Sequence, residues 1–151
     1  MSTITRAGGS AKNKEPIFLK LAPDLTFEQM DDALDLVQKY KLAGVVATNT
    51  TINHPVPPEG GLSGAPLRQR ATECIRHIYR QTHGRVPIIG VGGIFSAADA
   101  YEKIRAGATL IEVWTGLIYE GPELVANINR GLLRLLERDG FYSVADAIGT
   151  E

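Results

Sequence analysis

Residues 87–94 read Pro-Ile-Ile-Gly-Val-Gly-Gly-Ile, and residues 110–116 read Leu-Ile-Glu-Val-Trp-Thr-Gly. Each stretch begins with an apolar run that is typical of a buried strand and reaches glycine or threonine at its end. Glycines allow backbone N–H groups to approach phosphate oxygens closely, and the N-terminus of a following helix adds the positive end of its dipole. The two stretches therefore predict neighbouring strands with a phosphate-binding site at their C-terminal ends.

The rest of the chain repeats this pattern of an apolar run followed by a helical segment. Strands are predicted at 17–22, 44–49, 86–91 and 109–114, and helices at about 26–40, 67–82, 96–107 and 123–138. Thr26 with Gln29, and Ser96 with Asp99, have the spacing of helix N-terminal caps. A long loop rich in proline and glycine, residues 50–66, separates the second strand from its helix. The alternation predicts four consecutive βα units with a parallel sheet and right-handed crossovers.

Two α/β architectures fit this pattern, a small doubly wound sheet and half of a (β/α)₈ barrel. A complete barrel needs about 250 residues, and this chain has 151. Polar residues or glycines follow every predicted strand, and this is the face on which such barrels carry their active sites. These residues are Lys20 with Asp24, Thr48 to Thr50, Gly92 with Gly93, and Thr115 with Gly116. The pattern favours the half barrel, and a phosphate site in the last two units favours its C-terminal half.

Composition excludes several classes of function. The net charge of −1 gives no general attraction to nucleic acid or to anionic lipid. The single cysteine, Cys74, excludes an internal disulfide, and no spacing of cysteine and histidine predicts a metal site. We expect Cys74 to pack as a small apolar residue, and His77 and His83 to lie at the surface. Residues 1–15 are predicted to be a disordered leader or a remnant of cloning, and residues 16–151 to form one half-barrel domain.

Several motifs stand in a fixed order along the chain. They are Phe-Leu-Lys-Leu-Ala-Pro-Asp-Leu at 18–25, Thr-Asn-Thr-Thr at 48–51, Gly-Gly-Leu-Ser-Gly-Ala-Pro-Leu at 60–67 and Ile-Ile-Gly-Val-Gly-Gly-Ile at 88–94. In this order and spacing the sequence resembles the dihydroorotate dehydrogenases, in particular their quinone-dependent, membrane-associated class. The resemblance begins at Pro16, continues through 103–108 and ends near 146–149.

The resemblance implies a flavoprotein oxidoreductase of pyrimidine biosynthesis that oxidises dihydroorotate to orotate with FMN as cofactor. Lys20 would lie near the flavin ring, where its charge stabilises the reduced form. Gly92, Gly93 and Thr115 would hold the FMN phosphate. Trp114 replaces an expected tyrosine, which keeps the apolar surface but removes a hydroxyl. The full set of implied cofactor-binding residues is Lys20, Thr48, Ser63, Gly64, Val91, Gly92, Gly93, Val113, Trp114 and Thr115. The implied substrate-binding residues are Asn49 and Thr50.

Less specific interpretations of the same residues stay open. Lys20 could be an edge lysine that reaches solvent, residues 48–50 could only terminate a strand, and the glycines at 60–64 and 92–93 could only form turns. Two other functions therefore remain. One is a noncatalytic half barrel that binds FMN or phosphate, and the other is a different phosphate-site barrel enzyme, such as a sugar-phosphate isomerase.

The resemblance places the remaining parts of such an enzyme in an N-terminal half of the barrel, which this sequence does not match. Those parts are the catalytic base, further substrate ligands and the region that contacts quinone and membrane. The catalytic base is therefore unassigned. The resemblance implies a location on the cytoplasmic side, with full-length family members peripheral on the inner membrane, although this sequence contains no membrane segment. Because an open half barrel leaves strand edges and an apolar inner face uncovered, we expect self-association or pairing with an N-terminal half.

Overall fold

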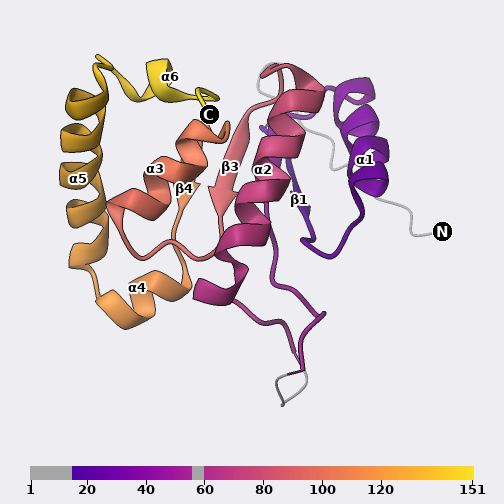
Figure 1. The fold of residues 1–151 in the computed structure, drawn as a ribbon. Helices are drawn as coiled ribbons and strands as arrows, with labels where there is room; N and C mark the ends of the chain where they lie inside the picture. The colour runs from indigo at the N-terminus through magenta and orange to yellow at the C-terminus, as the bar shows by residue number, and fades with distance from the viewer. Residues whose placement is uncertain (1–14, 56–59) are drawn as a thin grey trace.

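The computed structural model describes residues 15–55 and 60–151, and Figure 1 shows its elements. The predicted leader at 1–15 lies, apart from Glu15, outside the described residues. The strands are β1 (Phe18–Leu21), β2 (Gly44–Ala47), β3 (Ile88–Val91) and β4 (Leu110–Glu112). The helices are α1 (Phe27–Lys39), η1 (Ala65–Leu67), α2 (Arg68–Thr82), α3 (Ala97–Arg105), α4 (Thr115–Glu120), α5 (Glu123–Asp139) and α6 (Val144–Ala147).

The four strands form one parallel sheet in the order β1-β2-β3-β4. Lys20 lies opposite Val46, Val46 opposite Ile89, and Ile89 opposite Leu110. The order of strands never reverses, so right-handed crossovers place every connecting helix on the same face of the sheet. A doubly wound sheet would need a reversal and helices on both faces. The predicted four parallel βα units are therefore confirmed, and the arrangement is that of half of a (β/α)₈ barrel.

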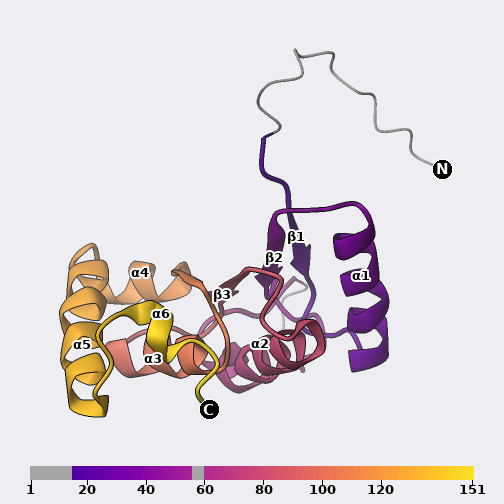
Figure 2. The same cartoon turned by 90° about the horizontal axis from the view of Figure 1, so that it is seen from above.

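The helices cover only the outer face of the sheet, and Figure 2 shows α1, α2 and α3 along one side of it. Successive residues of a strand point to opposite faces. Leu21, Val45 and Ile88 therefore pack outward into a buried cluster with residues of α1 and α2. The alternate positions face inward, and there Leu110 is 61% exposed. This inner face is the interior of the barrel in a complete (β/α)₈ fold.

Besides the short 3₁₀ turn η1, α4 and α6 were not predicted from the sequence. α4 begins at Thr115, directly after the fourth strand, and has no side-chain cap, so nothing local marks its start. α6 does carry a cap that the sequence could have revealed, since Ser143 and Asp146 form a capping box. Each strand is also shorter than its apolar run, because the sheet pairing ends before the terminal residues of these runs.

The expectation for His77 is wrong in part. Its side chain is only 16% exposed, its Nε2 lies 2.7 Å from Asp31 Oδ1 on α1, and its ring stacks on Phe27. The reason is that α1 and α2 pack against each other and enclose this side of α2. His83 is exposed, as expected. Cys74 is buried, as expected, and burial raises the pKa of its thiol to about 11.

Across residues 15–55 and 60–151, no helix combines the length and apolar character needed to cross a membrane.

Candidate functional site

A pocket of about 270 Å³ lies at the C-terminal ends of the strands. All the residues that the sequence analysis singled out as cofactor- or substrate-binding line this pocket. They are Lys20, Thr48, Asn49, Thr50, Ser63, Gly64, Val91, Gly92, Gly93, Val113, Trp114 and Thr115. Leu67, Ile94, Glu112 and Gly116 complete its lining. Residues more than ninety positions apart thus meet at one end of the sheet, because the strands are parallel and their C-terminal ends share one edge.

The conformation of the turn after β3 favours glycine at its centre. Gly92 and Gly93 have φ angles of +117° and +68°, which L side chains rarely adopt. A Cβ atom on Gly93 would lie 2.5 Å from Arg68 Cβ and 2.6 Å from Arg68 Cα. The turn therefore packs directly on the first residue of α2, while Gly92 and Gly93 also line the pocket. This is the geometry in which backbone N–H groups can reach a phosphate.

A hydroxyl pair joins two segments of the pocket wall. Thr115 Oγ1 donates a hydrogen bond to Ser63 Oγ at 2.8 Å. Gly64 lies against the same threonine, because a Cβ there would stand 3.1 Å from Thr115 Cγ2. The loop after β2 is thereby held to the start of α4. Ser63 and Thr115 can each turn a hydroxyl toward a bound anion.

The end of β2 presents polar side chains while its backbone stays in the sheet. Thr48 N donates to Val91 O at 3.1 Å, and Asn49 N donates to Leu21 O at 2.7 Å. Thr48 Oγ1 is buried without a hydrogen-bond partner among the described residues, and Asn49 is exposed. Both side chains are therefore available to a ligand in the pocket.

Lys20 lies in the pocket but is not buried. Its Nζ is 3.6 Å from Glu112 Oε1, and the two side chains are 43% and 38% exposed. The sequence analysis did not single out Glu112. An acidic residue within the apolar run 109–114 was the available signal, since a charge on a strand that is covered on both faces needs a partner.

Asp24 anchors the loop that borders the pocket. Its carboxylate accepts hydrogen bonds from the Thr51 hydroxyl and, at 3.0 Å, from Ile52 N. Thr51 and Leu62 also exchange backbone hydrogen bonds, which join the two arms of the loop. Although burial favours the protonated form, the hydrogen bonds from Thr51 and Ile52 outweigh it and lower the pKa of Asp24. Ionised Asp24 thus helps to hold Thr50 and Ser63 at the pocket.

Within the described part of the chain, no group of three or more metal-ligating side chains is gathered at one place.

Comparisons with known proteins bear on this site. The family model described as dihydroorotate dehydrogenase matches residues 1–136. The quinone-type dihydroorotate dehydrogenase of Anaeromyxobacter dehalogenans strain 2CP-C is 54% identical over 144 residues, which are 91% of this chain and 40% of that protein. The corresponding protein of Nostoc punctiforme is 51% identical over 151 residues, again 91% of this chain and 40% of the relative.

Solved structures agree with these relatives. The dihydroorotate dehydrogenase of Eimeria tenella, crystallised with ferulenol, superimposes with a TM-score of 0.85 at 43% identity. The match covers 89% of this chain and 38% of that protein. The chain thus spans about 40% of the length of the curated relatives that it matches.

Proposed function

Because this chain belongs to the dihydroorotate dehydrogenase family, we propose that it forms the flavin- and substrate-binding half of a quinone-dependent dihydroorotate dehydrogenase. One observation carries the proposal. All the residues to which the family resemblance gives a role line one pocket at the C-terminal end of the sheet. The names of its relatives specify quinone as the acceptor, and we propose the same class of acceptor here. Association with a membrane surface stays a prediction from the family resemblance.

The pocket suits FMN in its polar groups. The Gly92–Gly93 turn brings backbone without side chains to the pocket wall, and a phosphate can approach such a turn closely. The Thr115 hydroxyl lies at the same wall of the pocket. Among the described residues Thr48 Oγ1 is a buried polar atom without a partner, and a flavin would supply one. Bound FMN supplies the hydride acceptor for the oxidation.

Residues of this chain would bind and orient the other reacting groups. The Lys20 ammonium stands at the pocket wall, where a positive charge stabilises the electron-rich reduced state of a flavin. The Asn49 amide offers a donor and an acceptor together, which match the edge of a pyrimidine ring. In the oxidation, dihydroorotate loses a proton from the carbon next to its carboxylate-bearing carbon and a hydride from the carboxylate-bearing carbon itself. We assign no base for that proton among the described residues.

The edges of the sheet support pairing with the other half of a barrel. Among the described residues, β1 pairs only with β2 and β4 only with β3. Leu110 and Trp114 of the inner face are 61% and 71% exposed. Open strand edges beside an apolar surface favour association. We propose that a complementary half covers this face in the enzyme, and that the isolated chain self-associates.

The proposal is tested by mixing this chain with the N-terminal half of the Anaeromyxobacter relative, FMN and dihydroorotate without oxygen. We expect dihydroorotate to bleach the flavin absorbance and orotate to form in equal amount. Asn49→Ala should abolish bleaching by removing a pocket side chain, whereas Asn53→Ala should not, since Asn53 is exposed and outside the pocket. Flavin that binds but is never bleached would instead identify a noncatalytic flavin-binding module.

A further inference from the structure

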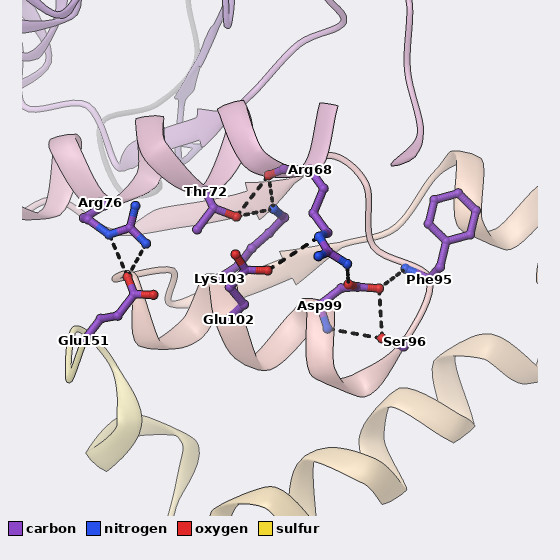
Figure 3. Close-up of polar contacts among 9 residues, drawn as sticks. All are labelled: Arg68, Thr72, Arg76, Phe95, Ser96, Asp99, Glu102, Lys103 and Glu151. Carbon is purple, nitrogen blue, oxygen red and sulfur yellow. Dashed lines mark hydrogen bonds and ion pairs between the residues drawn. The ribbon is translucent and has the colours of Figure 1, made fainter. Parts of the chain in front are cut away.

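A network of charged side chains lies between α2 and α3 (Figure 3). Arg68 Nη1 lies 2.5 Å from Asp99 Oδ1. The other carboxylate oxygen, Asp99 Oδ2, accepts hydrogen bonds from Phe95 N at 3.1 Å and from Ser96 Oγ at 2.8 Å. Asp99 is 7% exposed. It therefore ties the end of the turn to the first residue of α2.

The backbone of the same arginine is fixed by a second set of bonds. Arg68 O accepts hydrogen bonds from Lys103 Nζ at 3.2 Å and from Thr72 Oγ1 at 3.0 Å. Lys103, on α3, is completely buried. α3 thus holds Arg68 at its side chain through Asp99 and at its carbonyl through Lys103. Glu102 Oε2, also on α3, lies 3.7 Å from Arg68 Nε, so α3 fixes Arg68 at both its side chain and its carbonyl.

The turn rests on this fixed residue. At Gly93 an added Cβ would stand 2.5–2.7 Å from Arg68 Cβ, Cα and N, so the turn has no room to shift toward α2. At the other end, Phe95 N is held by Asp99. Gly93 lines the pocket, whereas Arg68 and Asp99 do not. The network therefore acts on a ligand in this pocket through the turn and through the charges of Arg68 and Asp99, without touching the ligand.

We propose that Arg68 and Asp99 are positioning residues for the cofactor phosphate, which hold the 92–95 turn with its backbone N–H groups directed at the pocket. A turn with two glycines has many accessible conformations, and anchoring it in advance reduces the entropy lost on binding. Arg68 also neutralises a buried carboxylate that would otherwise repel a phosphate dianion. This inference rests on the proposed function.

The test compares FMN with riboflavin, which lacks the phosphate, by quenching of flavin fluorescence. Arg68→Gln is the main variant because the Arg68 side chain is 52% exposed, so the fold should tolerate its loss. Asp99→Asn is the second, since its amide oxygen can still accept from Phe95 N. Both should weaken FMN binding, by about tenfold for Arg68→Gln, and leave riboflavin binding unchanged. A substitution that merely disturbs the fold would weaken the binding of both FMN and riboflavin.

Glu151→Gln is the matched control. It breaks an ion pair of similar length, Arg76 Nη2 to Glu151 Oε2 at 2.5 Å (Figure 3). Arg76 lies about two turns after Arg68 on α2, and neither Arg76 nor Glu151 lines the pocket. Glu151→Gln should change neither affinity. An FMN preference that survives in both Arg68→Gln and Asp99→Asn would overturn the inference alone. Equal affinity of the unaltered chain for FMN and riboflavin would overturn the phosphate site and the inference together.

A measurement without ligand tests the same geometry. Hydrogen exchange of the Phe95 amide in the free chain should accelerate in Arg68→Gln relative to Glu151→Gln, because Asp99 loses the partner that holds it in place. Unchanged exchange would show that the turn does not depend on Arg68, and would contradict the inference even if no flavin binds.

Discussion

Lys103 provides a quantitative test of the packing between α2 and α3. The side chain is fully buried, and its ammonium donates hydrogen bonds to Thr72 Oγ1 at 3.0 Å and to Arg68 O at 3.2 Å. Both acceptors are neutral. Burial therefore lowers the pKa of Lys103 from its ordinary 10.5 to about 8.

The sign of the effect on stability follows from the protons bound in each state. Between pH 8 and 10.5 the unfolded chain keeps the Lys103 proton and the folded chain releases it. The free energy of unfolding should therefore rise with pH through this window. A folded-state pKa of about 8 against 10.5 corresponds to ~3 kcal/mol. Below pH 8 the folded chain bears the full cost of the buried charge.

Lys103→Met removes the charge and keeps an unbranched side chain of similar length. At pH 7 the variant avoids ~3 kcal/mol of charge burial but loses two hydrogen bonds worth ~1 kcal/mol each. Arg68 O keeps its bond from Thr72. We expect the variant to be as stable as the unaltered chain at pH 7, or up to about 1 kcal/mol more stable.

The assay is urea unfolding at several pH values from 7 to 10.5. At each pH the free energy of unfolding of the variant is subtracted from that of the unaltered chain, so that the contributions of other titrating groups cancel. The unaltered chain should gain stability relative to Lys103→Met as pH rises. Lys39→Met, on the exposed face of α1, removes a lysine outside the packing of α2 against α3 and serves as the control. Parallel curves for Lys103→Met and the unaltered chain would refute the reasoning.

Three further predictions concern the pocket and its surroundings. Gly93→Val should lower the unfolding free energy by at least ~2 kcal/mol, since it combines a positive φ with a collision against Arg68. The control is Gly121→Ala, where φ is also positive but the space around the residue is open. A thermal unfolding temperature of Gly93→Val that is no lower than that of the control would contradict this. Asp24→Asn should speed proteolytic cleavage within 50–62. Because the pKa of Asp24 is lowered in the folded chain, its contribution to stability should be present above its unfolded pKa of 3.8 and be lost as pH falls below it. Cleavage rates that do not change on acidification would argue against the role of Asp24 as an anchor. Cys74, with a thiol pKa of about 11, should resist alkylation at pH 8 until the chain is unfolded in urea, and rapid reaction of the folded chain would disprove its burial.

The features predicted best from the sequence are those that depend only on the direction of the strands. Lys20, Asn49, Gly93 and Thr115 could be placed together because the C-terminal ends of parallel strands share one edge, whatever the detailed geometry. The choice of a half barrel over a doubly wound sheet followed from the same strand ends, and the unreversed strand order confirms it.

Side-chain contacts between residues far apart in the sequence could not be predicted from local sequence patterns. The pairing of Lys20 with Glu112 joins the first and last strands and depends on how the sheet curves. The contact of Arg68 with Asp99 joins two helices 31 positions apart, and its sequence signal was only the cap at the start of α3. α4 was missed because a six-residue helix without a side-chain cap leaves no periodic pattern to detect.

The most direct test of the flavin site is to record backbone amide NMR shifts while FMN is added to the chain. The account predicts saturable changes that are largest at Gly92, Gly93 and Thr115, and much smaller changes at these amides with riboflavin. Largest changes at residues outside the pocket, or equal changes with FMN and riboflavin, would contradict the claim that this turn and this threonine hold the phosphate.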